Sequence, residues 1–255
     1  MWLSVDPVFH AGTSPYAYCL GNPVVMVDPD GRDEIYCRED GSEISRIEKE
    51  EEVRYVLGTN QPTFQMYSEY SPSEKGYSDM MGVGDAMIGE MLIKDICEGN
   101  GNPLIPKEYI RGRYFVRAPN QDEFDASMNF IGDDGTGGRA DNNNREYSFD
   151  LQPFDIKIGS RYVPNGYVAY NTFIGPVGDP SKDEMASTES RINHTHPSGV
   201  GSKSEKDKWQ QAPSATDIKN SNSMIRRVWG MGSKTIYLFN KDGVKATIPF
   251  SVYGR

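Results

Sequence analysis

Two of the three histidines in this chain stand one residue apart, in the segment NHTHPSG at residues 193–199. In an extended segment, residues i and i+2 point to the same face, so His194 and His196 can direct two imidazoles at one point. Pro197 cannot donate to a sheet ladder, which favours a position at the end of a strand beside a loop. The segment therefore predicts a strand that ends where two imidazoles converge.

A second polar segment, PSATD at residues 213–217, follows a flexible, charged loop. Asp217 adds a carboxylate to the two histidines, and three protein ligands leave the fourth tetrahedral position of a zinc ion open for water. Such an open site is typical of catalytic rather than structural zinc. Ser214 and Asp217 also have the spacing of a helix capping box, and the two interpretations are compatible: Ser214 can open a helix whose first turn presents Asp217.

The order of an upstream glutamate, then H-[ST]-H-P, then S-x-x-D resembles the motif of the JAMM (MPN-type) zinc metalloproteases. The resemblance covers about seventy residues of the chain, up to Asp217. It implies that His194, His196 and Asp217 bind Zn2+ as the cofactor. It also implies that Ser214 lies beside the reacting carbonyl, and that a glutamate on a strand serves as general base.

Glu146 is the candidate for that base, because its segment REYSF resembles the glutamate-bearing strand of toxin members of the family. Glu189 is the alternative. The resemblance implies an α/β (α+β) fold of the JAB/MPN type, with a central mixed, mostly antiparallel sheet flanked by helices. We expect residues 141–255 to form this metalloprotease domain, preceded by a loop-rich N-terminal extension.

The first 32 residues contain SPYAY, GNPV and DPDG, which are turn signals around short extended pieces. The combined string is similar to the tail of the Rhs repeat-associated core domain. In Rhs-type polymorphic toxins, the DPDG element marks the junction before a variable C-terminal toxin. The resemblance implies a secreted bacterial effector, delivered by a specialised secretion system into a target cell. Its implied partners are a protein or peptide substrate, a cognate immunity protein and the rest of the Rhs shell.

The leading expectation is therefore a toxin that hydrolyses peptide or isopeptide bonds with zinc. One alternative is a catalytically inactive MPN-like module used for interaction. Another is a toxin of a different hydrolase class. A zinc deaminase needs a cysteine pair after its His-x-Glu, and no cysteine lies beyond Cys97.

Composition restricts the classes of protein to which the chain can belong. The net charge is −10, and residues 33–100 hold 16 Asp and Glu against 6 Lys and Arg, so no basic surface for nucleic acid is expected. The three cysteines, Cys19, Cys37 and Cys97, are too scattered to indicate a disulfide framework. No apolar run is long enough for a membrane span, and the amino end lacks the basic and apolar regions of a signal peptide.

Residues 33–140 are expected to be acidic and loop-rich, with a helix over 79–98 whose apolar residues recur at helical spacing. A short helix is expected over 48–54. Alternation of polar and apolar residues and β-rich composition predict strands. These cover residues 113–116, 145–151, 154–158 and 166–174.

Beyond the histidine pair, Trp209 is the residue that could hold the charged loop of residues 200–213 in place. A helix is expected from Ser214 to about Trp229, with Val228 and Trp229 facing inward. A closing hairpin is expected around the NKDG turn at residues 240–243.

Overall fold

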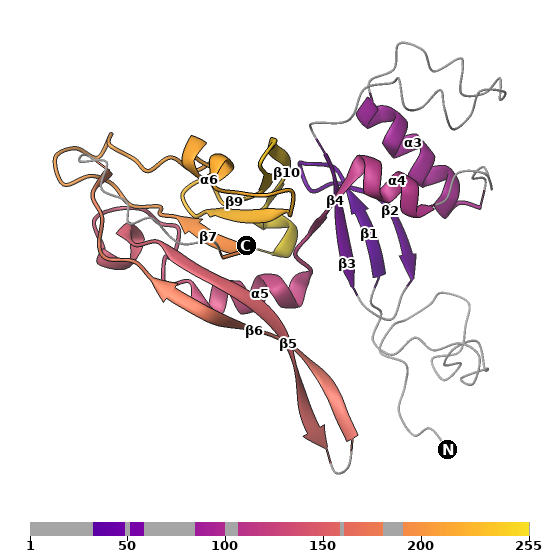
Figure 1. Ribbon diagram of the computed structural model, residues 1–255, viewed down its shortest axis with the longest axis horizontal. Coiled ribbons are helices and arrows are strands. Elements are labelled where there is room, and N and C mark those ends of the chain that lie inside the picture. The colour runs from indigo at the N-terminus through magenta and orange to yellow at the C-terminus, as the bar shows by residue number, and fades with distance from the viewer. Residues whose placement is uncertain are drawn as a thin grey trace.

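The computed structural model describes residues 33–48, 52–58, 85–99, 107–158, 161–180 and 191–254. Within these ranges the protein is a mixed α/β structure with two mixed sheets and few helices (Figure 1). The Rhs-like string of residues 1–32 and the alternative base Glu189 lie outside the described residues. No helix in the described part is both long and apolar enough to cross a bilayer.

The first sheet is built from residues 33–118 and has the strand order β2-β1-β3-β4. β1 pairs in parallel with β3, and its other pairing, with β2, is antiparallel, as is that of β3 with β4. Two helices pack on it and bury Tyr36, Ile93 and Tyr114 in a shared cluster. The elements are β1 (Asp33–Cys37), β2 (Glu43–Glu48), β3 (Val53–Leu57), α3 (Asp85–Cys97), α4 (Lys107–Tyr114) and β4 (Phe115–Ala118).

Several expectations for this region are corrected. The helix over 48–54 is wrong at its two ends, because Glu48 ends β2 and Val53 begins β3, where VRYVL is rich in β-branched and aromatic residues; residues 49–51 are not described. The helix over 79–98 is confirmed from Asp85 to Cys97, and residues 79–84 are not described. The strand expected at 113–116 begins only at Phe115, because α4 continues to Tyr114.

The second sheet has the order β10-β9-β8-β7-β5-β6 and is antiparallel except between β7 and β8. The expected mixed, mostly antiparallel sheet is thus present. The two strands expected at 145–151 and 154–158 form one long strand, β5. The elements are β5 (Tyr147–Ile158), β6 (Arg161–Ile174), β7 (Asn193–His196), β8 (Arg226–Gly230), β9 (Thr235–Asn240) and β10 (Gly243–Pro249).

The helix expected from Ser214 to Trp229 is wrong beyond its first turns. α6 covers only Ala215–Lys219, and the chain then enters β8 in the middle of the sheet. Val228 and Trp229 are both fully buried, as expected, but they face opposite sides of a strand. A strand buried on both faces has no polar alternation, so its pattern is easily confused with that of a helix.

Alternate residues of the second sheet form the core against α5 (Gln121–Phe130), which packs along β5 and β6 (Figure 1). Phe124 of α5 stacks on Tyr253 at 4.2 Å between ring centroids and contacts Trp229. The two sheets meet at this core, because Val56 of β3 and Ala118 of β4 belong to the same buried cluster as Trp229 of β8. The Tyr253 hydroxyl also donates to the Pro119 carbonyl at 2.8 Å. The β9–β10 hairpin is confirmed around its predicted turn.

Candidate metal centre

The histidine pair lies on β7, a four-residue strand held between β5 and β8. His194 is in register with Ser148 of β5 and with Val228 of β8. β7 ends at His196, immediately before Pro197, as the sequence predicts. Both imidazoles point to the face opposite the α5 core, and both side chains are buried, with 7% of His194 and 1% of His196 exposed.

Asp217 reaches the two imidazoles from the first turn of α6. Its Oδ1 lies 3.4 Å from Nε2 of His194, and its Oδ2 lies 3.4 Å from Nε2 of His196. The same carboxylate closes a capping box: Ser214 N donates to Asp217 Oδ2 at 2.6 Å, and Asp217 N donates to Ser214 Oγ at 3.1 Å. The capping interpretation and the ligand interpretation of S-x-x-D therefore describe one arrangement.

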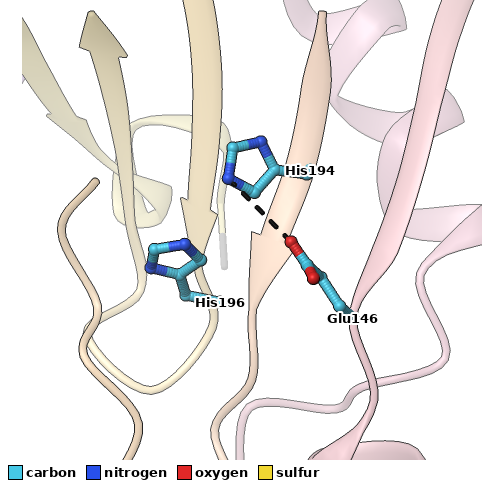
Figure 2. A group of neighbouring side chains, drawn as sticks. All are labelled: Glu146, His194 and His196. Atoms are coloured by element: carbon cyan, nitrogen blue, oxygen red, sulfur yellow. Dashed lines mark ion pairs between the residues drawn. The ribbon is translucent and has the colours of Figure 1, made fainter. Parts of the chain in front are cut away.

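Glu146 lies immediately before β5, not within a strand as expected. Its side chain is 5% exposed, and its Oε1 is 4.0 Å from Nε2 of His194. Figure 2 shows the carboxylate directed toward the His194 ring. Glu146, His194 and His196 each offer one ligand atom within 4.8 Å of the other two, so this buried cluster could hold a metal ion.

The protonation states suit a cation. Burial raises the pKa of Asp217, but the close approach of the His194 and His196 imidazoles outweighs this effect and holds that pKa well below its ordinary value. Burial lowers the pKa of His194, and this exceeds the opposite effect of Asp217. Near neutral pH the carboxylate is thus ionised and His194 is neutral, which are the forms that bind metals.

The Nε2 atoms of both histidines are buried and make no hydrogen bond within the described residues. They face Asp217 at 3.4 Å, yet the contacts do not have hydrogen-bond geometry. Buried polar atoms are nearly always paired, so two such nitrogens directed at one carboxylate need an explanation. A cation bound between the three side chains would use all of these atoms.

Residues that the sequence did not single out hold the loops around the cluster. Asp133 is buried and accepts hydrogen bonds from Ser198 N at 2.7 Å and Ser198 Oγ at 2.6 Å, which secures the turn after Pro197. Gln211 Nε2 donates to the Pro197 carbonyl at 2.9 Å. No local pattern marks Asp133, because its partner lies 65 residues further along the chain.

Trp209 has the role expected of it. Its side chain is buried, and its Nε1 donates to Asn144 Oδ1 at 3.0 Å. Because Asn144 immediately precedes the Glu146 segment, the indole fastens the charged loop of residues 200–208 beside the candidate base.

No family model matches the chain, and no curated protein or solved structure was found to be similar. The chemistry of the cluster is therefore inferred from its own residues.

Proposed function

We propose that this protein is a zinc-dependent hydrolase of peptide or isopeptide bonds, with His194, His196 and Asp217 as metal ligands. The observation that carries the proposal is the approach of one carboxylate to two buried, otherwise unbonded Nε2 atoms at 3.4 Å each. In a tetrahedral zinc site with bonds of about 2.0–2.1 Å, neighbouring ligand atoms lie roughly 3.3–3.4 Å apart. The donor set therefore fits zinc in type, and the two distances from the carboxylate to the imidazoles fit it in spacing.

Glu146 is proposed as the general base rather than as a ligand. Its 4.0 Å separation from His194 Nε2 exceeds the roughly 3.3 Å edge of a zinc tetrahedron. The carboxylate would thus lie just outside the ligand shell, where it can accept a proton from an attacking water and return it to the leaving amine. A zinc ion at this place would supply Lewis acidity.

Ser214 is proposed to stabilise negative charge on the reacting carbonyl oxygen. Its hydroxyl oxygen accepts a hydrogen bond from Asp217 N, and a hydroxyl that accepts can also donate its own proton. The capping box fixes this hydroxyl beside the Asp217 carboxylate. A donor placed in advance at such a position costs no reorganisation during reaction.

The proposed biological setting rests on the sequence alone. We propose that the chain includes the C-terminal effector region of an Rhs-type polymorphic toxin, delivered into a competitor cell. A cognate immunity protein would bind and silence it. The supporting residues are the Rhs-like string of residues 1–32, followed in the same chain by the JAMM-like motif.

Metal content and turnover of Glu146→Gln test the proposal together. We expect one zinc per chain by mass spectrometry in both wild type and Glu146→Gln. Release of new amino groups from unfolded polypeptides and from isopeptide-linked dimers should fall about 10²–10⁴-fold in the variant. Glu205→Gln, which changes an exposed glutamate in the charged loop, is the matched control.

Two results would contradict this proposal. Wild type that takes up no zinc after incubation with the metal would leave the histidine pair as a feature of an interaction module. Loss of zinc in Glu146→Gln would make Glu146 a ligand and remove it as the base.

A further inference from the structure

Thr195, the residue between the two candidate ligands, accepts a hydrogen bond from the start of β5 through its side chain. β5 and β7 pair at only two positions, Ser148 with His194 and Phe149 with Asn193. One residue further, Tyr147 N donates not to a backbone carbonyl but to the Thr195 side chain, with 2.9 Å between N and Oγ1. Thr195 is fully buried and, by alternation, faces away from the imidazoles.

This hydrogen bond acts on the backbone directly beside Glu146. The amide that donates to Thr195 belongs to the peptide group joining Glu146 to Tyr147. The Glu146 carbonyl, in the same peptide group, accepts from Gly175 N at 2.8 Å. One peptide plane is thus held between the ligand strand on one side and the segment after β6 on the other, and the Glu146 side chain leaves the chain at its edge.

The ligand strand does not depend on the same contact. All four residues of β7 are in register with β8, from Asn193 with Arg227 to His196 with Gly230. Asp217 is held separately by Ser214. Loss of the Thr195 oxygen should therefore move Glu146 relative to the imidazoles while the metal ligands keep their places.

We propose that Thr195 is a positioning residue that sets the distance between Glu146 and the candidate metal ligands. The inference rests on the proposed function, since it assigns Thr195 a task only if Glu146 acts as the base. A catalytic group must be held within about 0.5 Å of its productive geometry. A threonine hydroxyl that reaches across the end of a two-residue ladder provides that constraint.

Thr195→Val keeps the side-chain shape and removes the acceptor, whereas Thr195→Ser keeps the acceptor. We expect both variants to bind one zinc per chain with unchanged affinity. Thr195→Val should lower kcat by about 10–100-fold with little change in KM, as a misplacement of about 1 Å would. Thr195→Ser should retain activity within about threefold of wild type.

A double-mutant cycle with Glu146→Gln shows whether the effect passes through the base. If it does, Thr195→Val should cause no further loss of kcat in the Glu146→Gln background. A readout that needs no substrate is the visible absorption spectrum of the Co2+-loaded protein. Thr195→Val should shift this spectrum in the same direction as Glu146→Gln, and Thr195→Ser should leave it as in wild type.

The remaining outcomes distinguish failure of the positioning role from failure of the proposed function. Loss of metal in Thr195→Val, a spectrum and kcat equal to wild type, or a further loss in the Glu146→Gln background would each refute the positioning role and leave the proposed function standing. Wild type that binds neither zinc nor cobalt would refute both. Thr195→Ala, which also lacks the oxygen, takes the place of Thr195→Val if the valine variant does not fold.

Discussion

Replacing Asp217 with Asn separates its capping of α6 from its proposed role as a metal ligand. The asparagine side chain keeps an oxygen that can accept the hydrogen bond from Ser214 N, so the capping box at the start of α6 should survive. The negative charge that faces both imidazoles at 3.4 Å is lost. We therefore expect Asp217→Asn to fold with nearly wild-type stability without metal, and to respond weakly to zinc.

The size of the zinc response follows from linkage. A ligand present at 100 times its Kd stabilises the folded state by about 2.7 kcal/mol. For a chain of this size, about 1 kcal/mol corresponds to a Tm change of about 2–4 °C, so zinc should raise the wild-type Tm by about 5–11 °C. Loss of a ligand should weaken binding by at least the roughly 100-fold seen when strong outer-shell partners are removed. The same zinc concentration then contributes only about 0.4 kcal/mol, or about 1–2 °C.

The assay is thermal unfolding of chelator-treated protein, with and without a fixed zinc concentration. Asp242→Asn is the matched control, because that carboxylate is exposed in the β9–β10 turn and far from the histidines in sequence. It should show the full wild-type shift. An equal zinc-induced rise in Asp217→Asn and wild type would show that Asp217 is not a ligand.

Three further predictions concern the metal-free protein. Burial lowers the pKa of His194 below its ordinary 6.5, so the unfolded chain binds more protons as the pH falls through this value. Stability in urea should therefore decrease with falling pH, and less steeply in His194→Gln. Phe124→Ala, in the core, should cost about 3–5 kcal/mol in urea unfolding, whereas Phe173→Ala, at a side chain 39% exposed, should cost less than about 1 kcal/mol. Trp209→Phe loses the hydrogen bond to Asn144, so trypsin should cut the lysine-containing loop of residues 200–208 faster than in wild type.

The parts of the site that the sequence predicts are those with local causes. The i, i+2 spacing of His194 and His196 and the strand end before Pro197 follow from backbone geometry within a few residues. Ser214 and Asp217 belong to one helical turn. Ser214 and Asp217 lie near the histidines because the connection between the parallel strands β7 and β8 carries α6 back to them. The sequence indicates this proximity only through the combined pattern of the histidines, the serine and the aspartate.

The missed features have non-local causes. The sequence predicts a helix where β8 lies, because Val228 and Trp229 are buried on both faces of a central strand and no polar alternation marks it. Apart from the strand near β4, the sequence does not predict the first sheet, because β1 and β3 pair in parallel although β2 lies between them in the chain. Asp133 accepts a hydrogen bond from Ser198, which lies 65 residues later, and nothing in the local sequence of either residue predicts that contact.

The short strand that holds the histidines has a consequence for folding kinetics. β7 has four residues and pairs on one side with β5, 44–46 residues earlier, and on the other with β8, 34 residues later. So short a strand gains order only when its distant neighbours are in place, which makes it a late event in a topology of high contact order. Zinc would then bind only after the rate-limiting step. It should slow unfolding and leave the rate of folding nearly unchanged.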